Sequence, residues 1–192
     1  MLGVTCGASP IPFNLIGFTV EPLTAEFGWS RTEIILPATI YGLIASLMAP
    51  VFGWLADRHG VRKVALWSVF AFALALAAVA LTPTANKTST LYFYYGLWTV
   101  IGLVGIGSTP VTWSRAINLW FFRHRGLALG ILLMGTSVAA LVVPKLAVWA
   151  IAEFGWRMMF ALMALLPLLV ALPVAWLYFR EPRPEERPPA LV

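Results

Sequence analysis

The feature that most constrains this 192-residue chain is a series of long apolar runs. A bilayer core about 30 Å thick needs about 20 apolar residues in a helix, because an α-helix rises about 1.5 Å per residue. Strands of a membrane β-barrel would be about half as long and would alternate in polarity. The sequence therefore predicts an all-α integral membrane protein with six transmembrane helices in one bundle, at about 1–20, 34–56, 64–81, 91–114, 126–152 and 158–179.

The composition excludes a water-soluble domain. The chain is 60% apolar and 11% charged, whereas soluble domains are roughly half apolar and about a quarter charged. Its single cysteine, Cys6, excludes a disulfide framework and an all-cysteine metal site. The formal charge of +5 does not indicate a nucleic-acid partner, because the cations lie in short gaps between the apolar runs. We expect a lipid bilayer as the surroundings, and no metal, cofactor or nucleic acid.

The positions of the cations predict the orientation in the membrane. Cytoplasmic segments of membrane proteins carry an excess of Lys and Arg. An N-terminus inside the cell places nine cations on the inner side and three on the outer side. The sequence thus predicts a bacterial inner-membrane protein with both termini cytoplasmic, a bundle over 1–179 and a Pro-rich cytoplasmic linker or tail over 180–192. The inner set is Arg58, Arg62, Lys63, Arg115, Arg123, Arg125, Arg180, Arg183 and Arg187; the outer set is Arg31, Lys87 and Arg157.

Local cap and turn signals support the predicted borders. Ser30 and Glu33 have the spacing of a capping box, in which each side chain bonds the other residue's backbone amide at the start of a helix. Gly60 and Gly155 lie in the short connections after the second and fifth runs, where a tight reversal favours a residue without a Cβ. We therefore expect a helix to begin just after Ser30 and the chain to reverse at both glycines.

Polar side chains are unevenly distributed among the runs. Runs 1–20 and 91–114 contain several Ser, Thr and Asn residues, while 64–81 contains one serine and 158–179 contains none of these types. Polar groups surrounded by lipid need a protein or water partner, so the first and fourth helices are predicted to line a polar path. The third and sixth are predicted to face lipid. The alternative is that the hydroxyls bond their own backbone or a neighbouring helix.

Five residues are candidates for the substrate path. Asn14 lies mid-span and can hydrogen-bond a solute, while Trp98 and Thr109 share one stripe of the fourth run. For Asn14 the alternative is a hydrogen bond to another helix, and for Trp98 and Thr109 it is ordinary helix packing. Lys145 is the basic residue within a run, and it either extends to the outer surface or attracts an anionic substrate. Arg115 follows the fourth run, where an interfacial position is favoured over one in the cavity.

The apolar runs contain no Asp or Glu. A proton-coupled carrier usually relays protons through a buried carboxylate or histidine. Glu21, directly after the first run, is the nearest carboxylate and is therefore the candidate for coupling. The alternatives are a relay outside this chain, or exchange of one anion for another, which needs no relay.

The most specific motif is the segment GWLADRHGVRK between the second and third runs. Asp57 lies at the C-terminal end of the second helix, where the helix dipole disfavours an anion. We expect the nearby cations Arg58, Arg62 and Lys63 to hold it in a cluster that closes in one conformation and opens in another. The alternative is a static ion cluster that only fixes topology. The candidate latch residues are Gly53, Asp57, Arg58, Gly60, Arg62 and Lys63.

This segment resembles the loop signature of the major facilitator superfamily, Gly-x-x-x-Asp-Arg-x-Gly-x-Arg-Lys, at every fixed position. The stretches EFGWSRTEI at 26–34 and WFFRHRGLALG at 120–130 are similar to the branch of monocarboxylate and oxalate/formate-type porters. The resemblance implies a secondary transporter of two six-helix bundles, with the substrate bound between them near the midplane and alternating access by rocking. It covers this chain as one bundle, so a C-terminal six-helix half is the expected partner.

The residues and this resemblance together indicate secondary active transport of a small organic solute. The solute is expected to be an organic anion such as a mono- or dicarboxylate. The alternative is a truncated or non-transporting membrane fragment, or an assembly subunit of a split carrier. An intramembrane enzyme would need a cluster of His, Cys or carboxylate residues at membrane depth, and the runs contain no such cluster.

Overall fold

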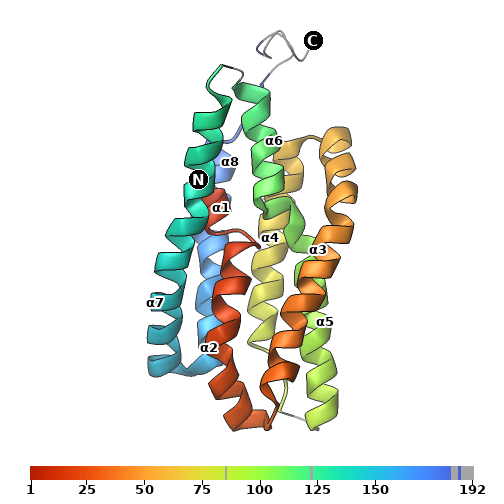
Figure 1. The fold of residues 1–192 in the computed structure, drawn as a ribbon, viewed down its shortest axis with the longest axis vertical. Helices are drawn as coiled ribbons and strands as arrows, with labels where there is room; N and C mark the ends of the chain where they lie inside the picture. Colours follow the sequence, from red (N-terminus) through yellow and green to blue (C-terminus); the bar gives the residue numbers. More distant parts are fainter. Residues whose placement is uncertain (85, 122, 183–185, 187–192) are drawn as a thin grey trace.

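The computed structural model describes residues 1–84, 86–121, 123–182 and 186, and all the regular elements within them are helical. This confirms the predicted all-α class. The long helices lie side by side along the longest axis of the molecule (Figure 1). The elements are α1 (Leu2–Thr5), α2 (Pro10–Phe27), α3 (Arg31–His59), α4 (Val61–Val79), α5 (Lys87–Gly105), the 3-10 turn η1 (Ile106–Ser108), α6 (Pro110–Trp120), α7 (Arg125–Leu165), the π-helical η2 (Leu166–Ala171) and α8 (Leu172–Tyr178).

Four stretches of the described residues are long and apolar enough to cross a membrane. This number differs from the six runs that the sequence predicts, and the helix geometry explains the difference at two places, described next. The four stretches are Arg31–His59, Val61–Val79, Lys87–Trp120 and Arg125–Tyr178.

The first difference lies in the stretch Arg125–Tyr178, which is 54 residues long. Within it Gly155 has φ 79° and ψ 171°, outside the helical region, so α7 joins two helices across a kink. A positive φ of this kind is open to glycine and strained for other residues. The chain descends along α7 and returns beside it to α8 (Figure 1). The expected reversal at Gly155 is therefore found, and this stretch has two antiparallel arms.

The second difference lies at the N-terminus. The run at 1–20 is divided between the short α1 and the longer α2, with a non-helical connection from Cys6 to Ser9. Helix α2 also continues to Phe27, seven residues beyond the predicted border, and its last turns carry Glu21 and Glu26. These carboxylates lower the mean hydropathy of the segment.

The α2–α3 and α3–α4 connections show why the chain turns where it does. Ser30 caps α3 by accepting a hydrogen bond from the Glu33 amide at 3.3 Å, and the Glu33 carboxylate accepts one from the Ser30 amide at 2.7 Å. This confirms the predicted capping box. Gly60 has φ 92° between α3 and α4, which confirms the predicted reversal.

Helix α4 shows how the bundle separates its buried and exposed faces. Val69, Phe72 and Leu76 are fully buried against the other helices. On the outer face Trp67 is 71% exposed and Leu74 is 53% exposed. Exposing large apolar side chains over such a surface is unfavourable in water, whereas lipid acyl chains solvate them well.

Candidate functional site

Two interrupted helices meet inside the bundle. The break between α1 and α2 faces the break between α5 and α6, where η1 lies. Across this meeting point the Ala8 amide donates a hydrogen bond to the buried Ser108 Oγ at 3.0 Å, and the Tyr41 hydroxyl of α3 donates to the Ala8 carbonyl. Gly105 lies against Ala8 so closely that a Cβ at this glycine would clash. Backbone groups freed by a helix break within a membrane need such partners, so these contacts permit both breaks.

A cavity of about 420 Å³ lies beside the two breaks. Its polar lining comes from Ser9, Tyr41, Ser46 and Thr109, and its aromatic wall includes Phe13. The edge of the Phe13 ring packs against Tyr41 with the ring centroids 5.4 Å apart. Hydroxyl groups of this kind can donate and accept hydrogen bonds, so the cavity can bind a small polar solute.

Two helix N-termini border this cavity. Helix α2 begins after Ser9 and helix α6 begins after Thr109, and neither of these N-cap side chains bonds its own helix amides. The first N–H groups of a helix carry a partial positive charge. The wall favours negative charge through the helix dipoles rather than through free donors, because Pro10, Pro12 and Pro110 have no N–H and the Ile11 amide bonds the Gly7 carbonyl.

The structure places the predicted path residues in different environments. Thr109 lines the cavity, and its Oγ1 donates to the Ile106 carbonyl at 2.7 Å. Asn14 is half-buried on α2, and its Nδ2 donates to the Pro10 carbonyl at 2.7 Å, so its side chain bonds its own helix. Trp98 is fully buried in the core, with its ring 6.1 Å from Tyr94. Trp98 therefore matches the packing alternative, whereas Asn14 bonds its own helix and not another one.

Lys145 and Glu21 lie away from the cavity. Lys145 is exposed on α7. Glu21 is exposed on α2 and lines a separate open hollow of about 600 Å³, with Arg31 on the same wall. This hollow lies at the end of the bundle opposite the α3–α4 turn.

Asp57 forms its ion pair with Arg115, which comes from α6. Asp57 Oδ1 and Arg115 Nη1 are 2.6 Å apart, and the same Nη1 donates to the Gly53 carbonyl at 2.9 Å. Gly53 makes this possible because a Cβ there would lie 3.0 Å from Arg115 Nη2. The structure thus joins three of the predicted residues, Gly53, Asp57 and Arg115, in one contact.

The expected partners of Asp57 have other contacts, which corrects the sequence analysis. Arg58 lies over the Trp54 ring at 5.2 Å, and Arg62 Nη2 donates to the Trp176 carbonyl at 2.7 Å. Lys63 lies on the wall of a groove between α3, α4 and α5. Helix α3 continues to His59, so consecutive residues such as Asp57 and Arg58 point in different directions.

Glu181 is a functional candidate that the sequence analysis placed in a linker or tail. Its Oε1 accepts a hydrogen bond from the Arg62 amide at 2.6 Å, in the first turn of α4. A carboxylate is favourable at this position because the N-terminus of a helix is partly positive. A Cβ at Gly60 would lie 2.8 Å from the same oxygen, so the glycine leaves room for Glu181. Most of the predicted tail, 183–185 and 187–192, lies outside the described residues.

A second charged contact closes the opposite end of the bundle. Glu26 Oε1 of α2 pairs with Arg157 Nη1 at 2.7 Å, and Glu26 Oε2 accepts a hydrogen bond from Trp156 Nε1 at 2.6 Å. Arg157 Nη2 also donates to the Thr82 carbonyl at 3.2 Å, just beyond α4. The sequence analysis missed this clamp because its members are far apart in the chain. Among the described residues no group of three or more His, Cys, Asp or Glu side chains could hold a metal ion.

Known proteins are similar in sequence to this chain over nearly its whole length. Residues 3–191 match the Major Facilitator Superfamily. The chain is 26% identical to the cis,cis-muconate transport protein of Acinetobacter baylyi over 84% of its own length and 40% of that protein. It is 27% identical to the hexuronate transporter of Escherichia coli K12 over 90% of its length and 38% of that protein. It is 30% identical to the galacturonate transporter of Dickeya chrysanthemi over 91% of its length and 48% of that protein.

The chain spans less than half the length of these relatives. The match nevertheless covers both helix breaks, the Asp57–Arg115 pair and the Glu26–Arg157 clamp. The apolar helices, the exposed apolar surface and the family match agree, and the chain is a multi-pass membrane protein that belongs to the major facilitator superfamily.

Proposed function

We propose that the chain is the substrate-binding N-terminal half of a secondary transporter that moves a small organic anion by alternating access. The observation that carries this proposal is the cavity beside the α1–α2 and α5–α6 breaks. Substrate sites in secondary transporters are typically built at interrupted helices near the membrane midplane. The relatives support the class of solute, because they are named as transporters of muconate, hexuronate and galacturonate, which are organic acids.

The chemistry of the cavity also supports an anionic solute. Ser9, Tyr41 and Thr109 offer hydroxyl groups, and the N-terminal ends of α2 and α6 offer partial positive charge. The Tyr41 and Thr109 hydroxyls already donate to the Ala8 and Ile106 carbonyls, so Ser9 is the hydroxyl of these three that can donate to a carboxylate without breaking a bond within the protein. Phe13 gives the site an apolar wall for the carbon skeleton of the solute. A relationship to the monocarboxylate and oxalate/formate-type branch remains part of this proposal.

We also propose six membrane crossings with both termini in the cytoplasm. The crossings would be α1–α2, α3, α4, α5–α6 and the two arms of the stretch Arg125–Tyr178 on either side of Gly155. The excess of Lys and Arg at the α3–α4 end supports this orientation. A C-terminal six-helix half would complete the carrier, joined through 180–192.

The ion pair of Asp57 and Arg115 is proposed as a latch on the cytoplasmic side. The Asp57 side chain is 70% exposed and that of Arg115 is 38% exposed. Ion pairs with this exposure contribute little to stability because water screens both charges. Such a pair can therefore open and close as the carrier changes state.

Coupling is proposed to use Glu21, which shares its open hollow with Arg31 on the outer side. Exchange of anions without proton coupling remains the alternative for this step. Lys145, on the exposed surface of α7, is proposed to attract the anion from outside the cell.

A second function is a non-transporting membrane fragment or an assembly subunit of a split carrier. The chain covers 38% of the hexuronate transporter and 48% of the galacturonate transporter, so activity is tested with and without a C-terminal half. Uptake by vesicles that contain this chain alone, compared with vesicles that also contain a C-terminal half, distinguishes the two functions.

The cavity can be tested with a matched pair of threonines. Thr109 and Thr136 each donate a hydrogen bond to the carbonyl three residues earlier, at 2.7 Å, but Thr109 lines the cavity and Thr136 lies on α7. We expect Thr109→Val to weaken binding of labelled galacturonate or muconate to the purified chain in detergent by roughly fivefold. Thr136→Val should leave it unchanged. Equal binding by the two variants would contradict the proposed site.

Uptake by a complete carrier tests the transport step itself. The chain would be joined to the C-terminal half of the galacturonate transporter of Dickeya chrysanthemi, to which it is 30% identical. We expect vesicles with this carrier to accumulate labelled organic acids and to accumulate less after Thr109→Val. Absence of uptake, with the carrier correctly inserted, would favour the non-transporting alternative.

A further inference from the structure

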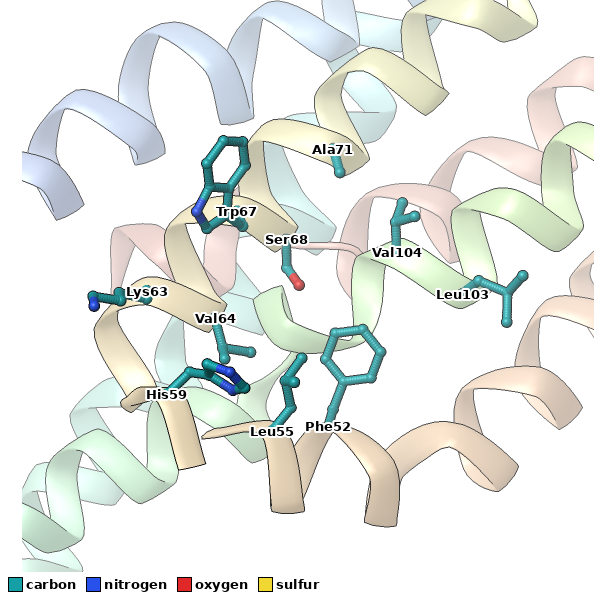
Figure 2. Close-up of a pocket in the computed structure, with 10 residues that line it drawn as sticks. All are labelled: Phe52, Leu55, His59, Lys63, Val64, Trp67, Ser68, Ala71, Leu103 and Val104. Atoms are coloured by element: carbon teal, nitrogen blue, oxygen red, sulfur yellow. The ribbon is translucent and has the colours of Figure 1, made fainter. Parts of the chain in front are cut away.

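A second cavity lies on the outside of the bundle, away from the proposed substrate site. It is a groove of about 430 Å³ between the end of α3, the beginning of α4 and the end of α5, here called the α3–α4–α5 groove. Figure 2 shows Phe52 and Leu55 on one side of the groove and Leu103 and Val104 on another. Its walls are mostly apolar, with polar groups from Ser68, His59 and Lys63, and its volume lies in the range of ligand pockets.

The mouth of this groove is basic. His59 and Lys63 line the end nearest the α3–α4 turn, opposite Leu103 and Val104, with the Lys63 side chain pointing outward from the groove (Figure 2). Both side chains are exposed. The stem of a lysine can follow an apolar wall while its ammonium group stays in the polar layer of the membrane. The groove therefore combines an apolar interior with a cationic entrance.

The two described carboxylates near the α3–α4 turn contact groups other than Lys63. Asp57 is paired with Arg115 at 2.6 Å. The Glu181 carboxylate accepts a hydrogen bond from the Arg62 amide at 2.6 Å. Among the described residues Lys63 forms no ion pair, so its ammonium group can bind an anion from outside the protein.

The groove opens toward lipid. Trp67, on its rim, is 71% exposed, and Phe70 and Leu74 continue the same exposed apolar face along α4. Tryptophan side chains are enriched where the hydrocarbon of a bilayer meets its headgroups. Lys63 and His59 then lie at the depth of the headgroups and Leu103 at the depth of the acyl chains.

We propose that the α3–α4–α5 groove is a binding site for an anionic diacyl phospholipid of the leaflet that borders the α3–α4 turn. One acyl chain lies along Phe52, Leu55, Leu103 and Val104. The headgroup phosphate binds the Lys63 ammonium group, and the His59 imidazole donates a hydrogen bond to a phosphate oxygen. Charge complementarity selects an anionic lipid over a zwitterionic one, since each basic residue near the membrane surface attracts anionic lipid.

The first test measures lipid binding to the purified full chain in detergent by native mass spectrometry. Phosphatidylglycerol is expected to bind more tightly than phosphatidylcholine. Lys63→Gln is expected to weaken phosphatidylglycerol binding by about fivefold, the effect of one basic residue. Lys87→Gln is the matched control, because Lys87 is also an exposed lysine and lies at the start of α5, outside the groove. Equal affinity for the two lipids, or equal effects of the two substitutions, would overturn the proposal.

The second test fills the groove. Leu103→Trp adds bulk to its wall and should abolish tight phosphatidylglycerol binding, while Leu74→Trp, on the exposed face of α4 outside the groove, should not. Both positions are exposed, so both variants are expected to fold. Unchanged lipid binding by Leu103→Trp would overturn the proposal.

Two further outcomes separate a lipid from other occupants. Glycerol 3-phosphate, which has the phosphate but no acyl chains, should not displace the bound lipid; displacement would indicate a simple anion site. Lipid binding should also persist when the chain is co-purified with a C-terminal half. Its loss there would show that protein covers the groove, and either result would overturn the proposal.

Discussion

Asp57 of α3 and Arg115 of α6 are 58 positions apart in the sequence, yet Asp57 Oδ1 and Arg115 Nη1 are 2.6 Å apart in the structure. Arg115 also binds the Gly53 carbonyl one turn earlier on α3, so a single guanidinium group joins two points of that helix. This arrangement makes Arg115 the residue on which the geometry of the loop motif depends.

The first prediction concerns this ion pair in the complete carrier. Asp57→Asn should reduce uptake by roughly tenfold, within the usual range of conformational coupling energies. The free energy of unfolding should change by less than about 1 kcal/mol, because the pair is largely exposed. Uptake by vesicles and denaturant titration in detergent measure the two effects separately.

Arg58→Gln is the control for this prediction. Arg58 is next to Asp57 in the sequence but lies over the Trp54 ring. The Arg58→Gln variant should leave uptake close to that of the unchanged carrier. If Arg58→Gln and Asp57→Asn lowered uptake equally, the overall charge of the loop would matter and the specific pair would not.

The second prediction concerns the junction of the two interrupted helices. Ser108→Ala removes the acceptor of the Ala8 amide and leaves this buried N–H group without its partner. We expect the free energy of unfolding to fall by about 1–3 kcal/mol. Ser114→Ala, on α6 near the surface, should cost less than about 0.5 kcal/mol. Similar losses for both serines would show that the junction does not depend on Ser108.

The third prediction concerns Gly60. Its φ of 92° and the closeness of Glu181 Oε1 both disfavour a side chain. Gly60→Ala should therefore lower the free energy of unfolding by about 1–3 kcal/mol. Gly96→Ala is the control, because Gly96 is inside α5 with open space around it, and alanine there should stabilise the helix by about 0.5–1 kcal/mol. Denaturant titration of both variants gives the comparison, and a neutral Gly60→Ala would contradict the strained geometry.

The fourth prediction concerns the clamp at Glu26. Glu26→Gln removes the ion pair with Arg157 but keeps an acceptor for Trp156 Nε1. The loss of stability should be about 1 kcal/mol, because the two side chains are partly exposed. High salt should reduce the difference from the unchanged protein, since salt screens exposed charges. Glu153→Gln, at an exposed position on α7, should have no such salt-dependent effect.

The sequence predicts the features that depend on neighbouring residues. The capping box of Ser30 and Glu33 and the reversals at Gly60 and Gly155 follow from the chemistry of a few adjacent positions, and the structure contains all three. The all-α class follows from the length and apolarity of the runs, which leave few other folds in lipid.

The sequence does not predict contacts between distant segments. Arg115, Glu181 and Glu26 each find a partner that helical periodicity cannot identify, because periodicity relates residues on one helix. Trp98 shows the same limit. Its position on one stripe of the helix is compatible with a cavity wall and with the core, and the structure places it in the core. The roles proposed for Asn14, Lys145 and Glu21 in transport stay predictions.

The clamp at Glu26 has a mechanical consequence. The Glu26 carboxylate of α2 binds Arg157 and Trp156, which lie on the arm that follows Gly155. Arg157 in turn binds the Thr82 carbonyl just after α4, so three segments are joined. The end near the α3–α4 turn combines the hydrogen bonds of Arg62 with the Asp57–Arg115 pair, which is more exposed than the pair of Glu26 and Arg157. If the helices separate during a transport cycle, we therefore expect the separation to begin where Asp57 and Arg115 meet.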